Sequence, residues 1–237
     1  MTDLHPDLVP YIIDHELFGK TIDHPLVRFM PLEHEGMTTR ANDCYKWKKN
    51  LLKKSVKERD WDAYVFAHER PYRVAALCDI RINHELTGRE FWPVLGSAWV
   101  DSNNIWQNPD EWLELWSERM PYSYSVMDKV DRKAFKALPD EMTVWRGVGN
   151  RDAVEGLSWT TDRNMALWFA YRFMKGRKPH LAQGQVSKRD VLAHFTGRGE
   201  SEIVVIPEYV VDITVEKLSA KSRDKFQEEY SKLKQAA

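Results

Sequence analysis

From Met142 to Val148 the chain reads MTVWRGV, and from Glu202 to Ile206 it reads EIVVI. β-Branched and aromatic residues dominate both stretches, and turn-forming residues bound them, which is the pattern of β-strands. A third stretch, YVVDITV over 209–215, has the same character. All three follow Pro139, so we predict a small β-sheet in the C-terminal part of the chain.

Other elements are expected between these strands. The stretch GLSWTT, 156–161, is predicted to be a short strand that enters a helix, with Asp162 or Thr161 as the N-cap and an end before Gly176. Residues 177–184 are expected to form a polar loop, and extended structure resumes from Gln185 through Phe195. The tail, 216–237, is charged and helix-prone.

Before Pro139 the sequence is helical in character. Apolar residues at spacings of three and four, Trp47 among them, predict a helix over 46–69. Further helices are expected over 71–85, 88–100, 109–119 and 123–137, and the tryptophans among them are expected to fill the core between helices: Trp92, Trp99, Trp106, Trp112 and Trp116.

The predicted organisation therefore has four parts. An acidic, histidine-rich segment, 1–45, precedes a helical region, 46–138, a β-rich core, 139–215, and a charged helical tail, 216–237. The fold class is α+β, with a helical N-terminal region followed by a small split β-sheet.

Composition excludes several classes of protein. The 237 residues carry 35 Lys and Arg against 36 Asp and Glu, a formal net charge of −1, so global charge does not direct the chain to nucleic acid. The two cysteines form neither a disulfide framework nor a zinc-ribbon spacing. There is no signal-peptide pattern and no apolar run of about 18 residues, so we expect a soluble cytoplasmic protein, with host cytoplasm as one possibility and no membrane partner.

Two features of the N-terminal half leave alternatives open. Histidines lie beside carboxylates in the echo IDHEL (13–17) and IDHPL (22–26), but no HxxxH spacing occurs, so surface or helix-end positions are favoured over a metal site. The lysine-rich face of 46–59 is either a solvated helix face or a surface for nucleic-acid phosphates, with the first favoured.

Common nucleotide and hydrolase motifs are missing from the sequence. There is no Walker A string, and Gly147-Val148-Gly149 begins a dinucleotide fingerprint that Asp152 breaks. Neither GxSxG nor HExxH occurs. A P-loop enzyme, a Rossmann dehydrogenase, a serine hydrolase of that type and a zincin are therefore disfavoured.

A different set of polar residues remains in the β-rich core. Arg146 lies within a strand, Ser158 and Thr160 are two residues apart, and so are Glu200 and Glu202. Because side chains alternate along a strand, each pair is expected to face one side, the two carboxylates facing one cleft. A guanidinium, hydroxyls and carboxylates together suit a substrate with phosphates, a ribose and a developing positive charge at the sugar C1, as in glycosyl transfer.

The order of these residues resembles the arginine-serine-glutamate class of mono-ADP-ribosyltransferases. VWRGV is similar to the first motif strand of that family, GLSWTTD with the following FA-containing helix resembles its serine motif, and FTGRGESEIVVIP resembles its ExE loop and following strand. The resemblance covers residues 142–207, somewhat over a quarter of the chain. It implies that NAD is a substrate and that no metal is required.

The resemblance also implies residue roles. Arg146 contacts the diphosphate or the nicotinamide-side ribose of NAD, Gly147 lets the backbone approach it, and Ser158 orients Glu202, which stabilises the oxocarbenium as nicotinamide leaves. Thr160 and Trp159 belong to the nicotinamide side, with Trp159 replacing a small hydroxyl residue and pointing either into the core or into that pocket. Glu200 binds the acceptor, which its carboxylate marks as an arginine side chain of a protein, and the turn that faces the acceptor contains Phe195 and Arg198. Arg177 and Lys178 are positional candidates for the diphosphate.

The expected activity is thus an arginine-specific mono-ADP-ribosyltransferase, a glycosyltransferase, acting as a toxin, a phage modifier of host proteins or a regulator. Three alternatives stay open. The acceptor can be water, which makes the chain an NAD glycohydrolase. It can be nucleic acid bound by the basic 46–59 helix, or the core can be a degenerate one kept for protein interaction.

Overall fold

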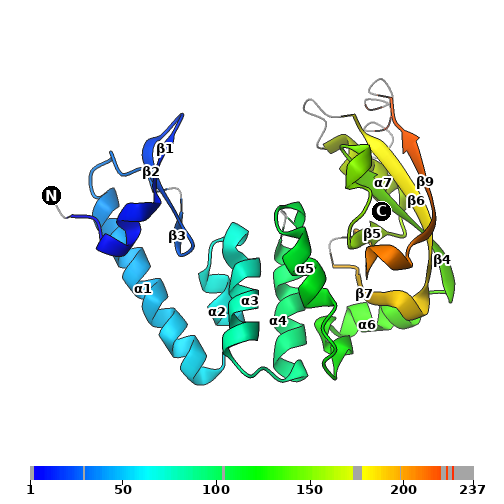
Figure 1. The fold of residues 1–237 in the computed structure, drawn as a ribbon, viewed down its shortest axis with the longest axis horizontal. Helices are drawn as coiled ribbons and strands as arrows, with labels where there is room; N and C mark the ends of the chain where they lie inside the picture. The colour runs from blue at the N-terminus through cyan, green and yellow to red at the C-terminus, as the bar shows by residue number, and fades with distance from the viewer. Residues whose placement is uncertain are drawn as a thin grey trace. The chain divides into compact units, whose positions relative to one another are not determined.

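The computed structural model describes residues 3–28, 30–102, 105–172, 178–197 and 199–219, with Arg223 and Phe226. In these residues the chain is a mixed helix and sheet protein, with most helices first and the largest sheet later (Figure 1). It divides into two compact units. The N-terminal unit comprises Met1–Leu115 and Met120–Tyr122, and the C-terminal unit comprises Trp116–Arg119 and Ser123–Ala237.

The N-terminal unit begins with a small antiparallel sheet in the order β1-β2-β3, formed by Ile12–His15, Gly19–His24 and Val27–Arg28. The two IDH echoes lie on its first two strands, so the expectation of loop or helix-end positions is wrong for them. The pairing of Ile12 with Ile22 follows from the hairpin register. One side of this sheet is packed into a buried cluster with the first helix: Leu8, Ile22, Leu26, Val27, Ala41 and Tyr45.

The helix predicted over 46–69 is two helices, α1 (Met37–Glu58) and α2 (Trp61–Ala67). Arg59 adopts a left-handed conformation at φ 55°, and its N–H bonds back to the last turn of α1. Asp60 then caps α2, because its carboxylate accepts from the N–H of Ala63 at 3.0 Å. The apolar spacing of the sequence continues across Arg59, so the spacing alone does not reveal the break. The contacts of Arg59 with Glu85 and Glu90 hold the break in place.

The later helices of this unit are close to their predicted ranges: α3 (Arg73–Asn83), α4 (Gly88–Asp101) and α5 (Pro109–Trp116). A capping box between Thr87 and Glu90 starts α4. The tryptophans Trp92, Trp99, Trp112 and Trp116 are buried, as predicted, whereas Trp106 is 70% exposed. Trp47, expected on the apolar face of its helix, is 62% exposed.

The C-terminal unit contains α6 (Lys129–Lys136), α7 (Arg163–Arg172) and a six-stranded sheet in the order β7-β8-β5-β4-β6-β9. In chain order the strands are β4 (Glu141–Val148), β5 (Ser158–Thr160), β6 (His180–Ser187), β7 (Val191–Phe195), β8 (Glu202–Val205) and β9 (Val211–Lys217). All neighbouring pairs are antiparallel. The sheet confirms the predicted C-terminal β-structure.

One prediction about this sheet is wrong. The polar loop expected over 177–184 is a strand from His180 onward, because β6 pairs with β4 along its whole length and with β9 on its other side. Two neighbours satisfy its backbone, and Leu181 and Ala182 are buried. Residues 173–177, which include Arg177, lie outside the described residues.

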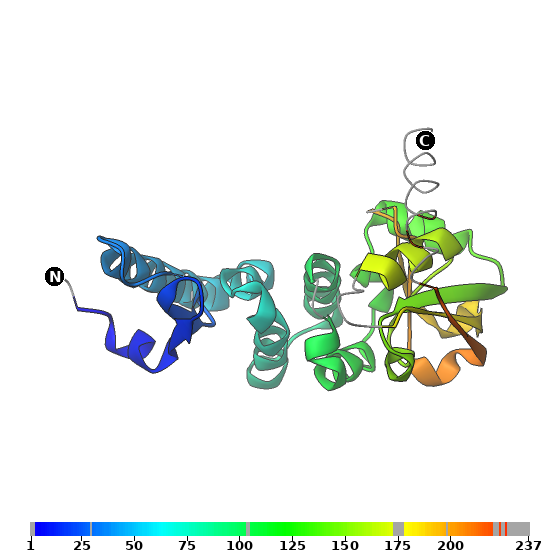
Figure 2. The same ribbon diagram turned by 90° about the horizontal axis from the view of Figure 1, so that it is seen from above.

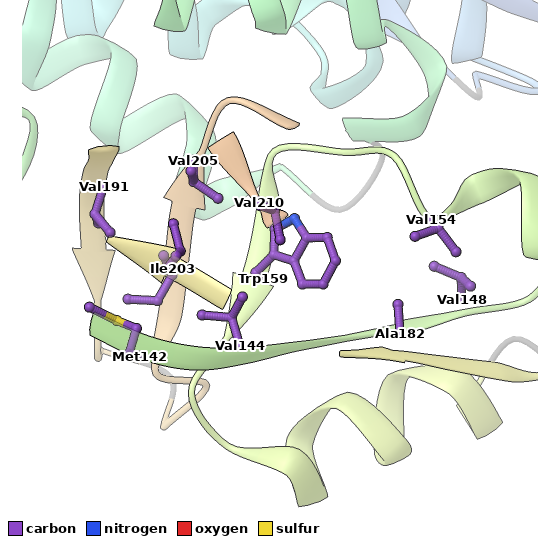
Figure 3. Packing of buried hydrophobic residues seen from close by; sticks show 11 residues of the cluster. Met142, Val144, Val148, Val154, Trp159, Ala182, Val191, Ile203, Val205 and Val210 are labelled. Carbon is purple, nitrogen blue, oxygen red and sulfur yellow. The ribbon is translucent and has the colours of Figure 1, made fainter. Parts of the chain in front are cut away.

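Each face of the sheet has its own apolar layer. On one face Trp159 lies among aliphatic side chains from several strands, including Val144 and Ile203 (Figure 3). On the other face α7 lies along the sheet and packs Ala166 and Ala170 against it (Figure 2). Gly147 makes this approach possible, since a Cβ there would lie 1.8 Å from the carbonyl oxygen of Ala166.

The C-terminal unit starts earlier than the boundary expected at 138–139. Helix α6 packs on β7, so it belongs with the sheet although its sequence is helical. Lys188 strengthens this connection, because its ammonium donates at 2.8 Å to the carbonyls of Lys136 and Leu138 at the end of α6. No helix within the described part of the chain combines the length and apolar character needed to span a membrane.

Candidate active site

Strand β5 is the centre of the polar cluster. It pairs with β8 at three positions, Ser158 with Val204, Trp159 with Ile203 and Thr160 with Glu202. Strand β5 also pairs with β4, where Thr160 lies opposite Trp145. Directly opposed residues of antiparallel strands share a face, so Thr160 and Glu202 lie on the same side of the sheet, and strand alternation adds Ser158 to them.

Glu202 is a buried carboxylate at the start of β8, with 6% of its surface exposed. The hydroxyl of Ser158 donates a hydrogen bond to its Oε1 at 2.5 Å. The two residues are 44 positions apart in sequence, and the β5–β8 pairing brings them together. A carboxylate fixed in this way is oriented before any substrate arrives, which is the arrangement that electrostatic stabilisation of a developing cation requires.

Arg146 connects β4 to the start of β5. Its Nη1 donates to the carbonyl of Ser158 at 2.6 Å, and its Nε lies 3.4 Å from the carbonyl of Ala153. Burial lowers the pKa of the guanidinium to about 10, and the Glu202 carboxylate acts in the opposite direction. Arg146 therefore stays charged at neutral pH and holds the backbone of Ser158, whose side chain holds Glu202.

Gly156 is a member of this cluster that the sequence reasoning missed. A Cβ at this position would lie 2.4 Å from Nη2 of Arg146 and 2.7 Å from its Cζ. The guanidinium occupies the space that a side chain at residue 156 would fill. The sequence shows a glycine at the start of GLSWTT. The reason for it, the close approach of Arg146 ten residues earlier, is visible only in the structure.

Glu200 lies outside the strand, contrary to the reasoning from strand alternation. Strand β8 begins at Glu202, and Ser201 between the two glutamates has a left-handed φ of 44°. The alternation argument therefore does not place the two carboxylates on one side. Instead, the backbone of Glu200 is held by Thr160, whose hydroxyl donates to its carbonyl oxygen at 2.6 Å.

Thr160 thus has a structural task in addition to its place beside Glu202. Its Oγ1 also accepts from the N–H of Asp162 at 3.0 Å, and the residue is 6% exposed. Asp162 in turn caps α7 by accepting from the N–H of Asn164 at 2.8 Å, which confirms it as one of the two expected caps. The serine-motif strand, the following helix and the Glu200 segment are therefore joined through one hydroxyl.

Three residues expected beside NAD or its acceptor are packed in the interior. Trp159 is 2% exposed, points into the core and donates to the carbonyl of Gly156 at 2.9 Å, so the core alternative holds for its ring (Figure 3). Phe195 is 6% exposed, with its ring edge-on to Trp116 at 6.4 Å. Gly147 is closely approached by the backbone of α7. Lys178 is exposed, and Arg198 lies outside the described residues.

Three histidines of the N-terminal unit are engaged in turns. The Nδ1 atoms of His5, His15 and His24 accept from the backbone N–H two residues later, at 3.2, 3.2 and 3.0 Å. This contact closes a local turn, as an asparagine or aspartate side chain does. Among the described residues, no group of three or more His, Cys, Asp and Glu side chains is arranged to hold a metal ion.

No family model matches the chain, and searches of curated proteins and of solved structures find no significant match.

Proposed function

We propose that the chain is a mono-ADP-ribosyltransferase that moves ADP-ribose from NAD to arginine side chains of a protein. The observation that supports this most is the Ser158–Glu202 hydrogen bond next to the Arg146–Ser158 contact. Three segments of the chain contribute to this arrangement, and they are the three that carry the family resemblance. An arginine that holds the backbone of a serine whose hydroxyl holds a buried glutamate is hard to explain by packing alone, since burying charge without a function is costly.

In the proposed reaction the bond between the ribose C1′ and the nicotinamide nitrogen breaks, and nicotinamide leaves as a neutral molecule. Glu202, held by Ser158, accepts a hydrogen bond from the ribose 2′-hydroxyl and stabilises the oxocarbenium that develops at C1′. A guanidinium nitrogen of the acceptor attacks C1′, and its proton passes to the Glu200 carboxylate. Arg146 keeps the Ser158 backbone in place and adds positive charge on the side where the NAD diphosphate is expected.

The test is transfer of label from adenylate-labelled NAD into the proteins of a bacterial lysate, together with nicotinamide release. We expect Glu202→Gln to lose both and Glu200→Gln to lose labelling while it still releases nicotinamide. Glu208→Gln, an exposed glutamate of the same unit, is the matched control and should retain both.

Other results of this test are equally informative. Nicotinamide release without labelled protein in the intact chain would favour the glycohydrolase. A chain that neither binds nor consumes NAD would contradict the proposal and favour a core kept for protein interaction.

Nucleic acid is the second candidate partner, and the exposure of Trp47 favours it. On the same helix as this ring, α1 exposes Lys46, Lys53, Lys54 and Lys57. An aromatic ring among cations is the arrangement that stacks a base and contacts phosphates. Three lysines of the helix are ion-paired: Lys48 with Glu69 at 2.7 Å, Lys49 with Asp7 at 3.1 Å and Lys54 with Glu58 at 3.8 Å.

A salt-dependent shift on single-stranded RNA or DNA tests this second candidate. We expect any binding to be lost in Trp47→Ala and in Lys53→Glu with Lys54→Glu, but not in Trp106→Ala, which removes another exposed tryptophan of the same unit. Equal binding by all variants would exclude this face of α1 as the surface.

A further inference from the structure

The segment between β7 and β8 carries Glu200 and is long for a hairpin connection. Phe195 and Glu202 form the last pair of the hairpin, which leaves six residues between them. Hairpin loops of two to about five residues are usual, and this one contains Gly197 and Gly199, so its backbone needs outside contacts to hold one conformation. The described residues of the segment show such contacts at both ends.

The first end is tied to α6. One oxygen of Asp131, Oδ1, accepts from the N–H of Thr196 at 2.8 Å and from its hydroxyl at 2.7 Å. Asp131 is 8% exposed, and its own N–H is taken by the N-cap Asp128 at 2.8 Å. A buried carboxylate that accepts two hydrogen bonds from one residue is a strong anchor, because charge-assisted bonds are stronger than neutral ones.

The second end is tied to β5 and to the start of the α7 segment. The hydroxyl of Thr160 donates to the carbonyl of Glu200 at 2.6 Å, and the N–H of Thr161 donates to the carbonyl of Ser201 at 3.2 Å. Within the segment the N–H of Gly199 donates to the carbonyl of Thr196 at 2.9 Å. The segment that carries Glu200 is therefore held at Glu200 by Thr160 of the strand next to Glu202, and at Thr196 by Asp131 of α6, 65 residues earlier.

We propose that Asp131 is a positioning residue that sets the place of Glu200 and thereby decides whether arginine or water accepts the ADP-ribose. The inference rests on the proposed function. Asp131 holds Thr196, whereas the proposed mechanism assigns the cleavage of the nicotinamide bond to Arg146, Ser158 and Glu202. Loss of the anchor should therefore affect the acceptor step more than the cleavage step.

The experiment measures two products of the full-length protein with NAD and L-arginine: ADP-ribosyl-arginine from transfer and free ADP-ribose from hydrolysis. In Asp131→Ala we expect transfer to fall about tenfold, the size of one lost charge-assisted contact, with hydrolysis changed less than about twofold. Asp131→Asn keeps an oxygen acceptor for Thr196 and should restore most of the transfer. Asp140→Ala, an exposed aspartate of the same unit, should match the wild type.

Amide hydrogen exchange supplies a readout that does not depend on turnover. The peptide over 196–201 should exchange faster in Asp131→Ala than in the wild type or in Asp131→Asn, while the peptide over β8 stays unchanged. Thr196→Val, which loses the hydroxyl donor and keeps the N–H, should lie between the two in both measurements. This variant keeps the test decisive if Asp131→Ala fails to fold.

Two outcomes would overturn the inference. One is an equal fall of transfer and hydrolysis in Asp131→Ala, which would make Asp131 merely structural. The other is that both transfer and hydrolysis stay at the wild-type rates in Asp131→Ala. A wild-type protein that neither transfers nor hydrolyses is a different failure, because it contradicts the proposed function itself.

Discussion

Arg59 in the N-terminal unit and Arg146 in the C-terminal unit both hold a backbone carbonyl, but in different surroundings. Arg59 is half-exposed, donates to the carbonyl of Glu85 at 2.8 Å and forms a two-pronged pair with Glu90 at 2.6 and 2.9 Å. Arg146 is partly buried and donates to the carbonyls of Ser158 and Ala153.

The difference shows in the pKa of each group. The hydrogen bonds that Arg59 donates to Glu90 raise the pKa of Arg59, and the same contact lowers the pKa of Glu90 to about 2. Burial instead lowers the pKa of Arg146 to about 10. Arg59 uses its charge to stabilise a helix connection, whereas Arg146 keeps a partly buried charge beside a serine that orients a buried glutamate. A buried charge of the second kind marks a functional site better than an ion pair of the first kind.

The largest expected effect comes from exchanging each arginine for lysine. Arg146→Lys keeps the charge but loses the forked guanidinium that holds Ser158, so we expect nicotinamide release to fall about 10²-fold. Arg59→Lys should leave it unchanged and lower only stability. Steady-state rates and thermal unfolding of the two variants check this, and a similar rate loss in both would break the comparison.

The next effect concerns the space around Arg146. Gly156→Ala places a Cβ against the guanidinium and should cost about 2 kcal/mol of folding free energy together with activity, because either the arginine or the strand has to move. Gly197→Ala is the control, since a Cβ there meets nothing within 4 Å. Denaturant titration compares the two. Equal stability would mean that Arg146 relocates at no cost and that its position is not fixed.

A smaller effect is expected from pH on the Arg59–Glu90 pair. The pKa of Glu90 is about 2 in the folded chain and 4.5 in the unfolded one, so its contribution is present above pH 4.5 and is lost as the pH falls towards 2. Because Arg59 is half-exposed, we expect the Glu90 charge to contribute only about 1 kcal/mol to the free energy of unfolding. Glu90→Gln preserves the capping box and removes the charge, so it should destabilise the chain at pH 7 and not at pH 2. A difference that persists at pH 2 would assign the effect to packing.

The smallest effect is expected at the turn-closing histidines. Asparagine can accept the same backbone N–H two residues later, so His15→Asn should change stability by less than about 0.5 kcal/mol. Addition of Zn²⁺ should not shift the Tm of either protein if these rings close turns rather than bind metal. A Zn²⁺-dependent rise in Tm that His15→Asn abolishes would revive the metal alternative.

Much of the fold was predictable because its signals are local. The capping box of α4, the Asp162 cap of α7 and the β-branched stretches of β4, β8 and β9 all act within a few residues. The break at Arg59 was not predictable in the same way, since Glu85 and Glu90 hold it from 26 and 31 residues away. Strand β6 was hidden for a similar reason, because two neighbouring strands satisfy the backbone of a polar sequence.

The sequence by itself determined which residues of the candidate site are present and in what order: Arg146, then Ser158 and Thr160, then Glu200 and Glu202. Only the tertiary structure decided which of them meet, because hydrogen bonds act over about 3 Å and strand pairing alone brings residues 44 apart to that distance. The tertiary structure also shows that Trp159 and Phe195 are buried in the core. It places Asp131 in contact with Thr196 and Gly156 against Arg146, next to the candidate site. The roles of Asp131 and Gly156 could not be predicted from the neighbouring sequence, because the residue that each one contacts lies elsewhere in the chain.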